Sequence, residues 1–80
     1  MTNWKHYRRE KVSGTPISLE QFNSDDGRFY IHVRKPDVKV GVLYADEEFE
    51  QKEEAERFYN SMLNPDKAVA YLNRYGVGLG

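Results

Sequence analysis

The sequence predicts an α+β domain in which an antiparallel meander sheet of three to four strands is covered on one face by two C-terminal helices. Three observations lead to this prediction. Apolar and polar residues alternate between residues 28 and 44, as they do in strands with one buried face. Residues that favour turns separate the alternating stretches. From residue 46 onward, apolar residues recur at helical spacing instead.

The clearest strand is expected at residues 28–34. One of its faces is apolar, with Phe29, Ile31 and Val33. The other is polar and aromatic, with Arg28, Tyr30, His32 and Arg34. Residues 38–44 alternate again and are expected to form a hairpin with this strand through a turn at residues 35–37. In that second strand one side would carry Val38, Val40, Val42 and Tyr44, and the other Lys39, Gly41 and Leu43.

The first 22 residues give weaker patterns. A strand is expected upstream of the turn at residues 23–27, because Asp26-Gly27 supplies the backbone conformation that tight connections need. Phe22 breaks the alternation begun by Ile17 and Leu19, which favours a bulged strand over a single helical turn starting near Ser18. Residues 4–12 are also expected to form a strand, although Trp4 and Tyr7 have helical spacing.

Two helices are expected after residue 45. Asp46 can cap the first, and the acidic residues that follow would lie near the positive end of the helix dipole. Its apolar stripe would be Phe49, Ala55, Phe58, Tyr59, Met62 and Leu63. Asn64-Pro65 combines a cap residue with a proline at the first helical position and starts the second helix. That helix would bury Ala68, Val69, Leu72 and Tyr75 and end at Gly76 in a left-handed cap.

Composition limits the class of protein. The 80 residues suit a single domain, 1–80, and the 39% hydrophobic and 14% aromatic content can support a small core. There is no cysteine, so disulfides, thiolate zinc sites and a cysteine nucleophile are excluded. The sequence contains no apolar run of signal-peptide or membrane-span type, so we expect a cytoplasmic protein without membrane contact.

Charge is distributed unevenly along the chain. The net charge is -1, but residues 1–45 carry eight bases and five acids, hence +3, whereas residues 46–80 carry four bases and eight acids, hence -4. The bases are therefore expected on the sheet and the acids on the first helix. A helix at residues 46–56 would place Glu48 near Lys52 and Glu53 near Arg57, so its acidity is explained as an ordinary solvated side. A basic partner for this helix is the alternative.

No catalytic or metal-binding pattern emerges from the sequence. The chain has two histidines, His6 and His32, neither with a ligand partner at close spacing. The C-terminal run at residues 76–80 is rich in glycine but follows a helix, whereas a phosphate-binding loop precedes one. We expect this run to dock on the helices as a tail. The sequence thus predicts a protein that is not an enzyme and needs no cofactor or metal.

The leading hypothesis is a non-catalytic interaction module, an accessory or regulatory protein that binds another protein through the exposed sheet face, a sheet edge or the acidic helix. Aromatic residues and arginine are enriched at interface centres. The expected contact residues are Trp4, Tyr7, Tyr30, His32 and Arg34. Homodimerisation is a related possibility for so small a domain.

Single-stranded nucleic acid is the alternative partner. Bases can stack on aromatic rings while cations contact phosphates, and the residues that would do this are Arg28, Tyr30, His32, Arg34 and Lys39. The net charge of -1 argues against it, because nucleic-acid affinity depends strongly on phosphate neutralisation. A simple solvated face is the third interpretation of these residues.

Overall fold

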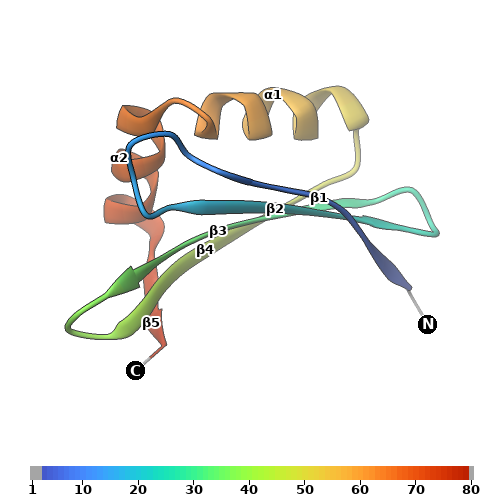
Figure 1. Ribbon diagram of the computed structural model, residues 1–80. Coiled ribbons are helices and arrows are strands. Elements are labelled where there is room, and N and C mark those ends of the chain that lie inside the picture. Colours follow the sequence, from blue (N-terminus) through green and yellow to red (C-terminus); the bar gives the residue numbers. More distant parts are fainter. Residues whose placement is uncertain (1–2, 80) are drawn as a thin grey trace.

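A computed structural model describes residues 3–79 and contains a five-stranded antiparallel sheet with two helices packed on one of its faces (Figure 1). The strands follow one another in the sheet in chain order. In sequence, the elements are β1 Trp4–Lys11, β2 Ser18–Ser24, β3 Phe29–Asp37, β4 Gly41–Phe49, α1 Lys52–Met62, α2 Pro65–Tyr75 and β5 Val77–Leu79. The predicted layout of a meander sheet followed by two C-terminal helices is confirmed, and the short β5 adds a strand to it.

The strand register gives the sheet two distinct faces. On the inner face, which the helices cover, Leu19 pairs with Val33 and Val33 with Ala45. On the opposite face, called the outer face from here on, Glu20 pairs with His32 and His32 with Asp46. Side chains alternate between the faces along each strand because the strand repeat is two residues.

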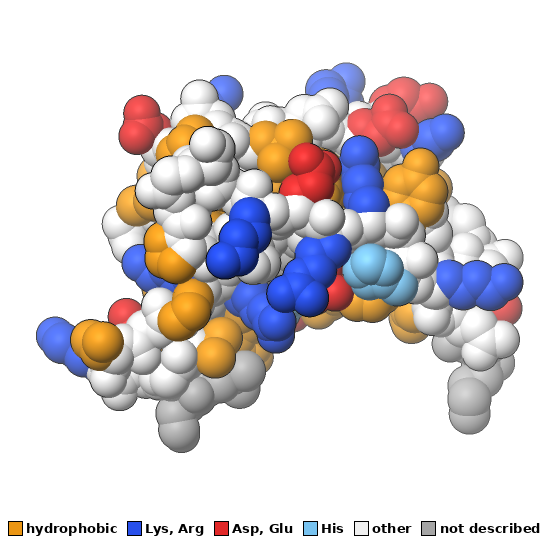
Figure 2. Space-filling model, viewed as in Figure 1, with side chains coloured by type: hydrophobic (Ala, Val, Ile, Leu, Met, Phe, Trp, Pro, Cys, Tyr) orange, Lys and Arg blue, Asp and Glu red, His pale blue; other side chains and the backbone are white. Residues whose placement is uncertain are grey.

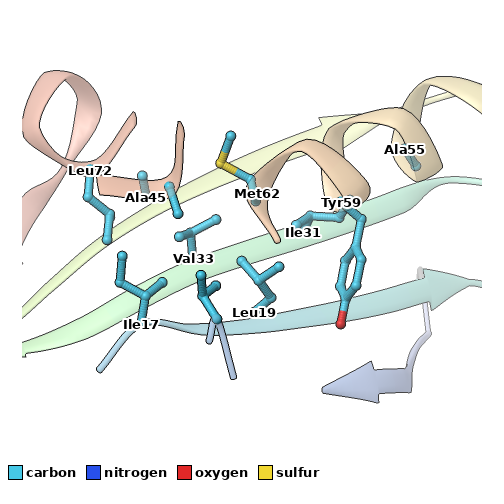
Figure 3. Close-up of a cluster of buried hydrophobic side chains, with 11 residues drawn as sticks. Ile17, Leu19, Ile31, Val33, Ala45, Ala55, Tyr59, Met62 and Leu72 are labelled. Carbon is cyan, nitrogen blue, oxygen red and sulfur yellow. The ribbon is translucent and has the colours of Figure 1, made fainter. Parts of the chain in front are cut away.

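The core lies between the inner face and the helices (Figure 3). The sheet side contributes Ile17, Leu19, Ile31 and Val33, all fully buried. The predicted helix stripes are confirmed at Ala55, Tyr59, Met62, Ala68 and Leu72. Val69 and Tyr75, however, are exposed. Val69 lies about 100° around the helix from Ala68. Tyr75 is the last residue of α2, and its ring lies beside Tyr71 and the Arg74 guanidinium rather than in the core.

Tyr59 is the largest fully buried side chain. Figure 3 shows its ring pointing from α1 toward β2. The Arg8 guanidinium carbon lies 3.8 Å from the ring centre, and the Nε of Arg8 donates a hydrogen bond to the Gln21 side chain at 2.9 Å. The Tyr59 hydroxyl lies near the Glu10 carboxylate but has no hydrogen bond of acceptable geometry within residues 3–79. Burial, reinforced by Glu10, raises the pKa of Tyr59 to about 12.

This raised pKa predicts a loss of stability at alkaline pH. An unfolded tyrosine ionises near pH 10, whereas folded Tyr59 keeps its proton to about pH 12, so its contribution is complete below pH 10 and is lost as the pH rises from there. The fall is at most about 1.4 kcal/mol per pH unit for one such group. We expect Tyr59→Phe to show a shallower decline of the urea midpoint between about pH 9.5 and 11.5 than the wild type. Identical declines would contradict a buried, neutral Tyr59.

The turn between β3 and β4 lies at residues 38–40, later than predicted. The Asp37 carboxylate accepts hydrogen bonds from the backbone N–H groups of Lys39 and Val40, at 3.0 and 2.9 Å. Gly41 then adopts a φ of +80°, which a residue with a side chain rarely takes. Pro36 remains inside β3, opposite Val42.

This later turn reverses the predicted faces of β4. The prediction placed Leu43 on the outer side, but Leu43 packs against the core and Ala45 is buried in it. The outer face of β4 instead carries the side chains of Val42, Tyr44, Asp46 and Glu48, as their pairing with outer-face residues of β3 requires. Val38 lies in the turn, fully exposed, and Lys39 lies beside it.

The predicted start of the first helix is also wrong, because β4 continues to Phe49 and α1 begins at Lys52. Gln51 occupies the N-cap position without a side-chain hydrogen bond, so Asp46 is not a cap. Glu47 lies on the inner face, where its carboxylate accepts a hydrogen bond of 3.1 Å from the Tyr71 hydroxyl. Asp46 and Glu48 therefore belong to the sheet, and Glu48 has no helical partner in Lys52.

The N-terminal half forms the two predicted strands, but the bulge lies in β1 rather than in β2. The register shifts between His6 and Arg8, which leaves Tyr7 as the extra residue. This shift turns both His6 and Arg9 to the outer face and lets Arg8 reach the core. Phe22 does not break the pattern of β2, because it belongs to the outer face.

The second helix begins as predicted. The Asn64 side chain accepts hydrogen bonds from the backbone N–H groups of Asp66 and Lys67, and Pro65 occupies the first turn. Gly76 has φ -67° and ψ 140°, so the predicted left-handed cap is wrong. The chain leaves the helix in an extended conformation and forms β5 along β4, so the tail docks on the sheet edge rather than on the helices. No helix within residues 3–79 is long and apolar enough to cross a membrane.

Candidate interaction surface

The outer face is the side of the sheet that no helix covers, and rings from four strands meet on it. Trp4 and His6 come from β1, Phe22 from β2, Tyr30 and His32 from β3, and Tyr44 from β4. We call these six side chains the aromatic row. Their alternation with inner-face residues brings them together, because the antiparallel register aligns the strands side by side.

Ring contacts run continuously along the aromatic row. Tyr30 lies at its centre, with ring centroids 5.8 Å from Trp4, 6.0 Å from Phe22 and 6.4 Å from His32. The row continues from Phe22 to His6 at 5.4 Å and from His32 to Tyr44 at 5.6 Å. These distances are typical of attractive aromatic pairs.

One end of the aromatic row opens into a hollow of about 380 Å³ lined by Trp4, Phe22, Tyr30 and Glu48. We call it the aromatic hollow. Trp4, the single tryptophan of the chain, is 39% exposed at its rim. In Figure 2 the outline of the molecule is concave on the side away from the helices. Three of the four lining side chains are aromatic, so the aromatic hollow suits an apolar group.

Carboxylates contact histidine or arginine side chains at three places around the aromatic row. His32 Nδ1 contacts Asp46 Oδ1, and His6 Nε2 lies 3.3 Å from Glu20 Oε2. Arg28 bridges Asp26 and Glu48, each at 3.3 Å, while its guanidinium carbon lies 5.6 Å from the Trp4 ring centre. Asp46 and Glu48, which the sequence placed on a helix, thereby offset the positive charge predicted for this face.

Tyr30 lies beside the carboxylate of Asp46, which also contacts His32. Its partial burial, together with a hydrogen bond to Asp46 and the charge of that carboxylate, raises the pKa of Tyr30 well above the usual value for tyrosine. The phenol therefore stays neutral at physiological pH. The carboxylates of Asp46 and Glu48 lie beside it, so the centre of the row carries no excess of positive charge.

A second hollow, of about 340 Å³, lies at the other end of the outer face. Four of its lining side chains are cationic, and none is acidic: they are Arg9 and Lys11 from β1, and Arg34 and Lys35 from β3. Pro16, Ser18, Pro36 and Val42 complete the lining. Within residues 3–79, none of the four cations forms an ion pair. We call this site the basic hollow.

The structure brings five of the seven predicted contact residues onto one face, namely Trp4, Arg28, Tyr30, His32 and Arg34. Tyr7 is 58% exposed in the bulge of the edge strand, and Lys39 lies in the β3–β4 turn instead of on the face. Whether any of these residues binds a partner stays a prediction.

Sequence reasoning missed His6, Phe22, Tyr44, Arg9 and Lys11 as members of this surface. The outward orientation of Phe22 could have been predicted from alternation, because Ser18, Glu20 and Phe22 alternate with Ile17, Leu19 and Gln21. The outward orientation of Arg9 and Lys11 could not be predicted from the sequence, because the bulge at Tyr7 determines which residues of β1 face outward.

The described part of the chain contains no group of three or more His, Asp or Glu side chains arranged to hold a metal ion. Comparison with family models, curated proteins and solved structures yields no match.

Proposed function

We propose that this domain is a non-catalytic interaction module that binds another protein through its outer face, with an apolar side chain of the partner seated in the aromatic hollow. The observation that supports it best is the aromatic hollow itself, where Trp4, Phe22 and Tyr30 surround a space of about 380 Å³ that no helix covers. Exposed apolar surface rimmed by polar groups is typical of interaction sites.

The residue types and their pairing favour a protein partner. Trp, Tyr and Arg contribute most to binding energy at protein interfaces, and Trp4, Tyr30 and Arg28 meet at this hollow. Arg28 is already engaged by Asp26 and Glu48, so the rim supplies little of the unbalanced positive charge that phosphates need. An apolar group entering the aromatic hollow would displace water from rings on three sides.

The test is a random-sequence peptide array probed with the labelled intact domain. We expect retained peptides to be enriched in Trp, Phe and Leu, and Trp4→Ala to lower their binding at least tenfold, about the loss of one hot-spot residue. Tyr75→Ala is the matched control, because Tyr75 is an exposed aromatic residue on α2, and it should retain wild-type binding.

Equal retention of the same peptides by the wild type and Trp4→Ala would refute the proposal. So would a loss on Tyr75→Ala as large as on Trp4→Ala, since that would place binding on the helical side. Unchanged urea midpoints of both variants would establish that lost binding does not reflect lost folding.

Single-stranded nucleic acid is a second candidate, supported by the basic hollow next to Tyr44 and His32. It predicts binding that falls with salt and weakens on both Tyr30→Ala and Arg34→Ala. The acidic residues Glu20, Asp46 and Glu48 within the same face weigh against it.

A further inference from the structure

The aromatic hollow and the basic hollow are linked by β3, which contributes Tyr30 to one and Arg34 to the other. Both side chains point to the outer face, with His32 between them. Four residues of a strand span about 13 Å. The two hollows are thus separated by a distance that another extended chain would also cover in four residues.

Charge differs sharply between the two hollows. Around the aromatic hollow, Arg28 and Glu48 compensate each other. Around the basic hollow, the row Lys11, Ser18, Arg34 and Tyr44 crosses four strands without an acid. The unpaired cations are complementary to a negatively charged group.

Arginine adds geometric preference to this charge. The guanidinium of Arg34 can donate two parallel hydrogen bonds to one carboxylate, which a lysine ammonium cannot do. Lys11 and Arg9 approach from β1, on the opposite side of β2, so a carboxylate in the basic hollow would meet cations from two strands. Arg34 is exposed and available for such a contact.

We infer that the partner segment is an extended peptide that seats an apolar side chain in the aromatic hollow and, four residues away, a carboxylate in the basic hollow. This inference rests on the proposed function and specifies the partner's chemistry. Residues four apart in an extended chain point to the same side, as both anchors require. A helical segment would need about nine residues to cover the same 13 Å.

The test uses fluorescein-labelled peptides of about ten residues on a Ser/Thr background, titrated with the intact domain and followed by anisotropy and by Trp4 fluorescence. The first carries Leu and, four residues on, Glu. The second replaces that Glu by Gln, the third moves it to three residues from Leu, and the fourth replaces Leu by Ser. An oligo(dT) of similar length is the nucleic-acid probe.

The Leu-Glu peptide is expected to bind at least fivefold more tightly than the Gln and shifted peptides, with an advantage that disappears at high salt. Arg34→Ala should lower binding of the Leu-Glu peptide about fivefold and leave the Gln peptide unaffected. Arg34→Lys should recover only part of this loss. Arg74→Ala removes an exposed arginine on α2 and should leave the affinities for the Leu-Glu and Gln peptides unchanged.

The outcomes separate the inference from the function on which it rests. Equal binding of the Leu-Glu and Gln peptides, still lost on Trp4→Ala, would overturn this inference and leave the proposed function in place. Tighter binding of the shifted peptide than of the Leu-Glu peptide would contradict the four-residue spacing between the two anchors. Failure of all peptides, with Arg34-dependent binding of oligo(dT), would overturn both in favour of nucleic acid.

Discussion

Tyr59→Ala is expected to lower the free energy of unfolding by about 3–5 kcal/mol, the usual cost of removing a buried aromatic side chain. Tyr59 is fully buried and is the largest such residue in the core. A chain of 80 residues has a total stability of roughly 4–12 kcal/mol, so this variant should be partly unfolded at moderate temperature. Urea denaturation followed by circular dichroism measures the loss.

Tyr59→Phe is the matched control for this prediction. It keeps the ring beneath Arg8 and removes only a buried hydroxyl that makes no acceptable hydrogen bond within the described residues. Removing such a group is expected to change stability by less than about 1 kcal/mol, in either direction. Equal losses for the Ala and Phe variants would mean that the hydroxyl, and not the ring, stabilises the core.

Gly76→Ala is expected to cost about 3 kcal/mol, the upper part of the range for overpacking. A Cβ at this position would lie 2.3 Å from the Leu72 carbonyl oxygen and 2.8 Å from Leu43 Cγ. The same carbonyl accepts the Gly76 N–H at 2.8 Å, so the backbone itself must move. We expect β5 to detach from β4, which hydrogen exchange of the Val77 and Tyr44 amides would detect as faster exchange.

Gly14→Ala separates this steric effect from ordinary glycine conformation. Gly14 has a φ of +74°, but a Cβ there would meet nothing within 4 Å. Its replacement should therefore cost about 1 kcal/mol from backbone strain alone and leave β5 protected. A larger loss for Gly14→Ala than for Gly76→Ala would contradict the close approach between α2 and β4.

The fold class was predictable because its signals are local. The alternation of Phe29, Ile31 and Val33 determines one buried face whatever the neighbouring strand is. The helical spacing of Ala55, Tyr59 and Met62 and the Asn64-Pro65 cap act within one or two turns. The folded chain keeps these strands and helices because their apolar faces pack against each other in the core.

The outer face was only half predictable for a related reason. Tyr30, His32 and Arg34 followed from alternation and Trp4 from its residue type, but the acidic members did not. Glu47 and Glu48 resemble the first turn of a helix in sequence. In the folded chain they pair with β3 instead, and Tyr71 contacts Glu47 while Arg28 contacts Glu48.

By itself, then, the sequence determined which segments are amphipathic, with which period, and that the sheet precedes the helices, since these properties depend on neighbours along the chain. Only the tertiary structure decided where β4 ends, which residues of β1 face outward, and that the two ends of the outer face differ in charge. These features depend on strand register, and register is set by the packing of several strands on one core and by the geometry of the turns and of the bulge. The basic hollow arises in this way, because the bulge at Tyr7 places Arg9 and Lys11 on the same face as Arg34.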